Sequence, residues 1–306
     1  MLADGNRRRF EAALITRCNG ETVNSKCLSA ELVETLQQMI RRRRPIGTVI
    51  ENLATATLPG LVEFGCLRYG REEEFPALPD ALCNCPLGIA IKEVPTRLGL
   101  RVDGPPKVPV KNLDTRPIEF QLVSSEHDLD EDVEWLNFLQ RFERSVKLSG
   151  FSDAAAANLQ SALHEMAENA QLHSQSPVSA IVGYEVRERA ALFSVADVGI
   201  GVLASLRTNP LYDAIVDDVN AIQLALRSGV TCRVGEHGGL GFNSVFKALA
   251  EQWGQLRFRS GNGCITMSGV DVEVDKSLRH RPLPLPGFQV SVCCRTSSNA
   301  ASWDFF

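Results

Sequence analysis

Residues 163–174, LHEMAENAQLHS, constrain the fold most, because two different patterns run along one predicted helix. From about residue 153 the segment lacks glycine and proline and is rich in alanine, which favours an α-helix. Glu165, Asn169 and His173 recur every fourth residue and form a polar stripe along it. A polar stripe alone is typical of the solvent side of a helix. Apolar residues at helical spacing predict the buried face: Leu159, Ala162, Leu163, Met166, Ala167 and Ala170.

Two glycine-containing blocks follow this helix in the chain. The first, VADVGIGV at 195–202, places Asp197 at the end of a predicted buried strand, where a carboxylate is costly unless it has a donor to bind. The second, GEHGGLGF at 235–242, precedes an apolar helix predicted over 242–253. Free amides at a helix N-terminus bind anions, so this block is a candidate phosphate site without a Walker signature.

In order and spacing the three blocks resemble the GHKL ATP-binding domain, which is shared by DNA gyrase B subunits, MutL-type repair proteins, heat-shock chaperones, histidine kinases and anti-sigma serine kinases. The resemblance covers about residues 120–296. It implies an α+β, two-layer α/β sandwich of the Bergerat ATP-binding type, with ATP and Mg²⁺ as ligands.

The resemblance also assigns roles to residues of this chain. Glu165 is the general base that activates water, and Asn169 supplies an amide oxygen to Mg²⁺. Asp197 accepts the exocyclic amine of adenine, while Gly199 and Gly201 let the backbone approach the purine. Phosphate binding falls to the third block: Gly235, Gly238, Gly239, Leu240 and Gly241.

Several assignments have alternatives. Glu168 is a competing base, although the motif register favours Glu165. His173 completes an Asn-Ala-x-x-His string similar to that of anti-sigma serine kinases. An equally weighted alternative is that His173 donates a hydrogen bond to a backbone carbonyl at the end of the helix. His164 precedes a glutamate, as phosphoacceptor histidines do. No dimerisation helix pair follows it, so this role is rejected.

A lid is expected over residues 202–238, with a helix of its own at 213–228. Within it Arg233 and His237 are candidate phosphate contacts, and solvent exposure is the alternative for both. Before the last strand, Gly287-Phe288 stands where the family usually has Gly-Thr. That departure puts a water-mediated adenine contact in doubt but not the Asp197 contact.

Strands and one further helix are predicted for the rest of residues 118–296. A helix is predicted within 126–150, with its carboxylates in the first turns and Gly150 at its end. Ser152 or Asp153 can cap the helix that follows. The predicted strands, bounded by turn residues, are 118–123, 178–186, 190–196, 255–260, 264–269 and 288–294.

The first part of the chain carries no recognisable motif. Helices are predicted at 7–17 and 29–43, and strands at 60–69, 87–94 and 97–102, which together suggest a separate small α/β domain over 1–102. Four prolines in 103–117 indicate a linker, followed by the 118–296 domain and a 297–306 tail. Arg41 to Arg44 suit a helix C-terminus, with a phosphate or acidic-partner site as the alternative.

Charge and composition narrow the function classes. Residues 1–117 hold 17 basic and 14 acidic residues, a net +3, whereas the remainder carries −8. An acidic ATPase half makes nucleic acid an unlikely partner there. Nine cysteines without paired metal spacing suggest free thiols. No apolar run is long enough to span a bilayer and no signal-peptide core is present, so no membrane association and a cytoplasmic location are expected.

Three functions follow from the resemblance, in order of preference. The first is a Mg²⁺-dependent ATP hydrolase or ATP-gated switch, supported by Glu165. The second is a serine/threonine kinase of the anti-sigma type that acts on a partner protein, supported by the string ending at His173. The third is a nucleotide-binding interaction module with little turnover. A protein partner of unknown identity and a homodimer are expectations drawn from the family.

Overall fold

The fold was analysed in a computed structural model of the chain. It describes residues 26–69, 71–79, 82, 118–123, 128–176, 180–227, 253–269 and 277–296. The expected helix at 7–17, the strands at 87–94 and 97–102, the linker and the tail lie outside these ranges. No helix within them has the length and apolar character needed to cross a membrane.

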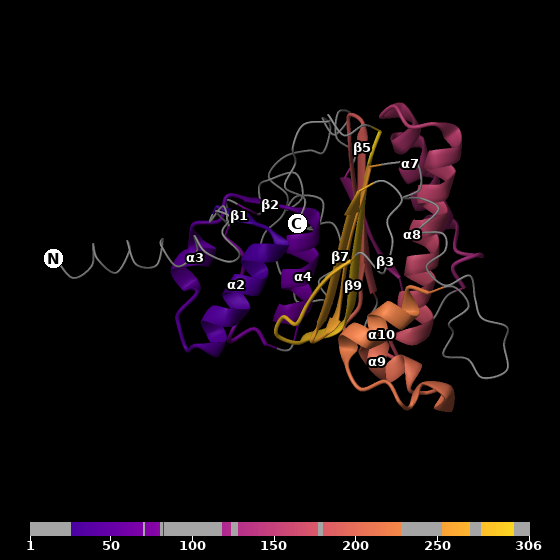
Figure 1. Ribbon diagram of the computed structural model, residues 1–306. Helices are drawn as coiled ribbons and strands as arrows, with labels where there is room; N and C mark the ends of the chain where they lie inside the picture. The colour runs from indigo at the N-terminus through magenta and orange to yellow at the C-terminus, as the bar shows by residue number, and fades with distance from the viewer. Residues whose placement is uncertain are drawn as a thin grey trace.

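A seven-stranded antiparallel sheet forms the centre of the molecule, in the order β3-β4-β5-β9-β6-β7-β8 (Figure 1). Its strands are β3 (Ile118–Val123), β4 (Ala180–Arg187), β5 (Ala190–Ala196), β6 (Trp253–Gly261), β7 (Gly263–Gly269), β8 (Leu278–His280) and β9 (Leu285–Arg295). Six of the seven were predicted from alternation and turn residues, with small shifts at their ends. The three-residue strand β8 was not predicted, and Trp253, assigned to a helix, begins β6 instead.

Helices α7 (Val133–Leu148) and α8 (Asp153–His173) cover one face of the sheet. Asp132 caps α7 by accepting hydrogen bonds from Glu134 and Trp135, and Ser152 caps α8. Both helices were predicted, because each has a clear apolar stripe. Their buried side chains form one core with the sheet residues that face them, such as Phe193 and Val290.

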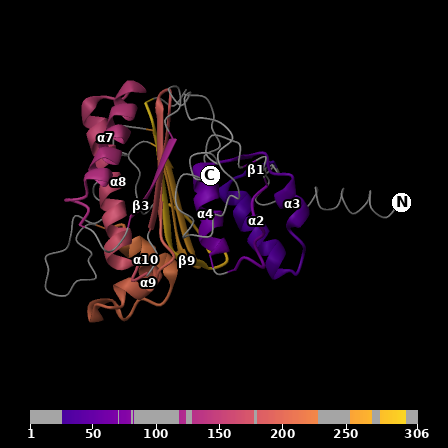
Figure 2. The ribbon, with the colours of Figure 1, turned by 180° about the vertical axis from the view of Figure 1, so that it is seen from behind.

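Helix α4 (Leu58–Arg68) covers the other face, and α2 (Ala30–Arg41) packs on α4 (Figure 2). The prediction for α2 is confirmed and Ser29 caps the helix, but the strand predicted at 60–69 is wrong. Thr57 caps α4 and Pro59 lies in its first turn. Both residue types are typical of the start of a helix. Because α4 is buried nearly all round, it lacks the helical periodicity that would reveal it.

The described residues up to 82 therefore do not form a separate unit. Leu61 and Phe64 of α4 share a hydrophobic core with sheet residues Ile181, Leu192 and Cys293. Helices cover both faces of the sheet. The described residues therefore form three layers, helix, sheet and helix, where the resemblance implied two. The remaining N-terminal elements are α3 (Gly47–Glu51) and the short parallel pair β1 (Cys27–Leu28) and β2 (Thr55–Ala56).

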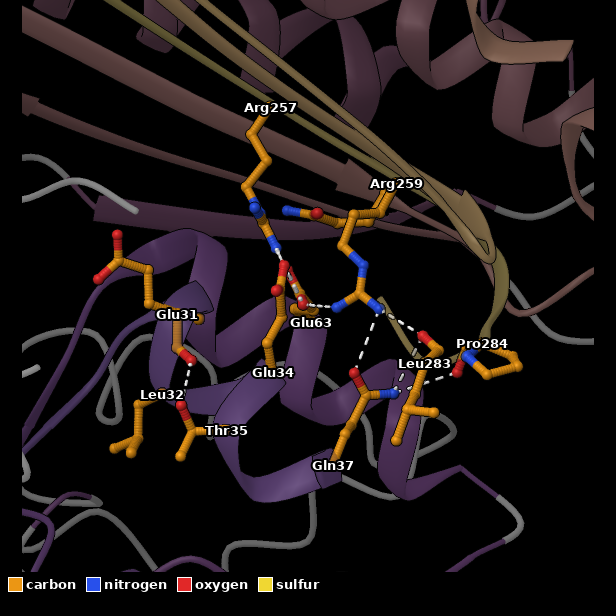
Figure 3. A network of polar contacts seen from close by, with 12 residues as sticks. Glu31, Leu32, Glu34, Thr35, Gln37, Glu63, Arg257, Arg259, Leu283 and Pro284 are labelled. Atoms are coloured by element: carbon orange, nitrogen blue, oxygen red, sulfur yellow. Dashed lines mark hydrogen bonds and ion pairs between the residues drawn. The ribbon is translucent and has the colours of Figure 1, made fainter. Parts of the chain in front are cut away.

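Buried charges join the N-terminal helices to the sheet (Figure 3). Glu63 of α4 is fully buried and pairs with Arg257 and Arg259, which project from β6. Arg257 also pairs with Glu34 of α2, while Arg259 donates to the side-chain oxygen of Gln37 at 3.2 Å. The two arginines are thus matched by two glutamates and an amide, all from the N-terminal helices.

Three short helical elements complete the fold at one end of α8. They are α9 (Gly201–Leu206), the 3-10 helix Pro210–Tyr212 and α10 (Asp218–Ala225). The helix predicted from residue 213 starts later than expected, because Asp217 caps it by accepting from the Asn220 amide.

Candidate functional site

The polar stripe on α8 lies along one flank of the helix. Glu165, Asn169 and His173 are all half-buried, whereas Leu163 and Met166 on the inner face are fully buried. With a rise of about 1.5 Å per residue, Glu165 and Asn169 are about 6 Å apart along the axis. The stripe ends at Ser174, the C-cap of the helix.

Glu168 lies on the opposite flank, facing α7. Its carboxylate is 3.9 Å from Nε2 of His164, which is also 3.3 Å from Asp130. The indole Nε1–H of Trp135 donates a hydrogen bond to Nδ1 of His164 at 2.9 Å. Glu168 therefore belongs to a cluster between α7 and α8, and it does not share a face with Asn169.

Asp197 follows the last residue of β5 and is 1 % exposed. Its Oδ1 accepts a hydrogen bond from the Gly199 amide at 2.6 Å, and its own amide donates to the Phe288 carbonyl at 3.0 Å. The other carboxylate oxygen, Oδ2, is buried and meets no hydrogen-bond donor among the residues that the structure describes. Burying a carboxylate oxygen without a hydrogen-bond donor costs free energy. This oxygen is therefore suited to accepting a hydrogen bond from a ligand.

The turn after Asp197 packs directly on the end of α8. The Ile200 amide donates to the Ser174 carbonyl at 2.9 Å, and a Cβ on Gly199 would lie 1.9 Å from the same oxygen. Gly201 has φ +77°, a backbone conformation that favours glycine. The glycines are thus required by contacts within the protein, whereas the sequence interpretation attributed them to an approaching purine.

Gly287 and Ser260 close the turn from the other side. Gly287 has φ +63°, and a Cβ there would lie 2.2 Å from the Asp197 carbonyl oxygen. Ser260 Oγ donates to the Gly287 carbonyl at 2.8 Å and accepts from the Val202 amide at 2.9 Å. Phe288, which stands where the family usually has threonine, is buried in the core beside Phe258.

Replacing Gly199 with alanine should lower the free energy of unfolding by about 1–3 kcal/mol, the usual cost of overpacking. The added Cβ would force the turn and the α8 terminus apart, because its three nearest atoms all belong to the Ser174 backbone. Urea denaturation measures the loss. Gly47→Ala is the matched control, since nothing lies within 4 Å of its added Cβ and it should leave stability unchanged or slightly raised. Equal stabilities of the two variants would contradict this packing.

Burial raises the pKa of Asp197 from 3.8 to about 7, although backbone hydrogen bonds from Gly199 and Phe288 oppose the rise. The folded protein therefore holds a proton that the unfolded chain loses above pH 3.8. This contribution to stability is present at acid pH and is lost as pH rises to about 7.

We expect wild-type stability to fall by roughly 2–4 kcal/mol relative to Asp197→Asn over that pH window, because asparagine does not titrate. Chemical denaturation of both proteins as a function of pH measures the difference. Parallel stability curves across the window would show that Asp197 is not desolvated.

The structure describes two of the three blocks and brings them together. Asp197, Gly199 and Gly201 lie at the end of the α8 stripe that holds Glu165, Asn169 and His173. The third block lies outside the described residues, with the two candidate lid contacts: Gly235, Gly238, Gly239, Leu240, Gly241, Arg233 and His237. Arg41 to Arg44 lie at the exposed end of α2, remote in sequence and packing from this site.

Sequence reasoning missed Ser174 and Ser260, whose backbone or hydroxyl oxygens hold the turn in place. A serine at a helix end or in a strand carries no signal of such long-range contacts. Asn169 is the residue best suited to a hard cation, because Mg²⁺ takes one or two protein oxygens and completes its shell with water and substrate phosphates. Comparisons with protein-family models, curated proteins and solved structures find no match to this chain.

Proposed function

We propose that the chain binds ATP with Mg²⁺ along the flank of α8 that ends at Asp197, in a domain of the GHKL, Bergerat type. The observation that carries the proposal is the Oδ2 of Asp197, which is buried where the α8 stripe ends and has no donor among the described residues. An exocyclic amine of adenine offers the missing donor. Guanine presents a carbonyl oxygen at that position, so the ionised carboxylate would reject it.

The order of groups along α8 suits a nucleotide laid beside the helix. Asp197 would hold the base near the C-terminal end, Asn169 would lie about one turn and a half back from Ser174, and Glu165 one turn further. Bound Mg²⁺ neutralises charge on the phosphates. Glu165 would accept the proton of an attacking water, and ATP hydrolysis, or a switch driven by it, is the activity that this arrangement supports best.

A kinase reaction is the second candidate, because His173 lies at the end of the same stripe. It uses the same ATP site and differs only in the acceptor, a hydroxyl group of a partner protein instead of water. A binding module with little turnover needs only the Asp197 end of the site.

Equilibrium binding of ATP and GTP in the presence of Mg²⁺ tests the proposal. Asp197→Asn should weaken ATP binding by about 10-fold or more and reduce the preference for ATP over GTP, because a directional contact to the base is lost. Asp213→Asn makes the same chemical change at an exposed aspartate and should leave both affinities unchanged. Undiminished ATP affinity and selectivity in Asp197→Asn would contradict the proposal.

A further inference from the structure

The sheet face toward α2 and α4 carries a second cluster of reactive side chains, at the edge away from the nucleotide site. Strand register pairs Arg259 with Cys264 and Cys264 with His280, so these three side chains lie in one row across β6, β7 and β8. Glu34 of α2 reaches the same row, where it pairs with Arg257 and with His280.

Three potential metal ligands converge there. Nε2 of His280 is 3.0 Å from Oε1 of Glu34, and the ligand atoms of Glu34, Cys264 and His280 all lie within 4.8 Å of one another. Cys264 is fully buried, whereas the His280 side chain is 42 % exposed. The cluster therefore has a dry inner side and a side that water can reach.

Glu34 supplies the negative charge at this position. Its carboxylate pairs with Arg257 and with His280. A metal ion held by the His280 ring would therefore meet the same carboxylate that the ring meets now.

We propose that Glu34, Cys264 and His280 bind a Zn²⁺ ion that fastens α2 to the β7–β8 edge of the sheet. Thiolate, imidazole and carboxylate are the ligands that zinc takes in proteins, at about 2.0–2.3 Å, so ligand atoms a few ångströms apart need only a small inward shift. Binding releases two protons, one from the Cys264 thiol and one from His280 Nε2.

Three protein ligands would leave one position of a tetrahedral zinc ion for water. Oε1 of Glu34 meets both Arg257 and His280, and an arginine hydrogen bond to a ligating carboxylate orients it.

The cluster of Asp130, His164 and Glu168 is also compact enough to hold an ion, but its hydrogen bonds argue against one. Trp135 donates to Nδ1 of His164, so that nitrogen must carry the lone pair and Nε2 must carry the proton. A metal on Nε2 would need the opposite tautomer. This cluster therefore provides a matched negative control.

The test uses the full-length chain, kept reduced with a phosphine, stripped with a chelator and titrated with Zn²⁺ against a chromophoric chelator. His280→Gln alters a half-exposed side chain and should weaken the tightest site by about 10–100-fold or more, whereas His164→Gln should not. Thermal unfolding should show the same pattern, with zinc raising the wild-type and His164→Gln midpoints but not that of His280→Gln.

Co²⁺ identifies the sulfur ligand, because a thiolate–cobalt charge-transfer band should form in the wild type and be absent in Cys264→Ser. The proposal is overturned if wild type binds zinc no more tightly than His280→Gln, or if the band persists in Cys264→Ser. ATP binding is unaffected by either outcome, since the two sites share no residue.

Discussion

Replacing Glu63 with glutamine is expected to lower the free energy of unfolding by about 3–5 kcal/mol, the usual result of removing one partner from a buried ion pair. Glu63 is 0 % exposed and is the carboxylate that both Arg257 and Arg259 contact. Without it, Glu34 alone would balance two buried guanidinium groups. The neutral amide of Gln37 cannot supply the missing charge.

Urea or guanidinium denaturation measures the loss, with Glu74→Gln as the control. Glu74 makes an exposed ion pair with Arg71, and such pairs contribute about 0–1 kcal/mol. A Glu63 variant as stable as the Glu74 variant would mean that α4 does not bury its carboxylate against β6. Since this network connects α4 to the sheet, the same result would question the packing of the N-terminal helices.

Replacing Glu165 with glutamine is expected to reduce phosphate release from ATP by about 10²–10⁴-fold, the range typical of losing a general base. The amide keeps the shape of the side chain but cannot accept the proton of the attacking water. ATP binding should change little, because the proposed site assigns binding to Asp197 and Asn169. Turnover and equilibrium binding are measured on the same samples with Mg²⁺.

Glu168→Gln is the control for the choice of base. Glu168 lies beside His164 on the α7 flank, so its substitution should leave turnover within a few-fold of wild type. Loss of turnover in Glu168→Gln alone would reverse the assignment. Tight ATP binding by the wild type without phosphate release would favour the kinase, which transfer of labelled phosphate to a purified partner would establish.

Much of the fold could be predicted from the sequence, because turn residues bound the antiparallel strands and the helices α2, α7 and α8 each have one apolar face. The packing of α4 on the sheet could not. In β6 the alternating Arg257 and Arg259 are typical of a solvent-facing side, yet that side is covered. The covering helix reads LPGLVEFGCLR, where the single buried charge, Glu63, gives no sign of its partners some 200 residues away.

The candidate site was predicted in part. Asp197 could be identified because a buried carboxylate at the end of an apolar strand is costly unless a donor binds it, and the structure buries it with one oxygen that meets no donor among the described residues. The role of the glycines could not be predicted, since it depends on Ser174 and Ser260 approaching from distant elements. The assignment of Glu165, Asn169 and His173 to nucleotide chemistry stays a prediction.

Amide hydrogen exchange with and without ATP and Mg²⁺ tests the location of the site most directly. The account predicts slower exchange in the second half of α8 and in residues 197–206, with α2 and α3 unchanged, because only the former line the proposed site. Saturating ATP that leaves α8 and residues 197–206 unprotected, or that protects α2 and α3 instead, would contradict the account.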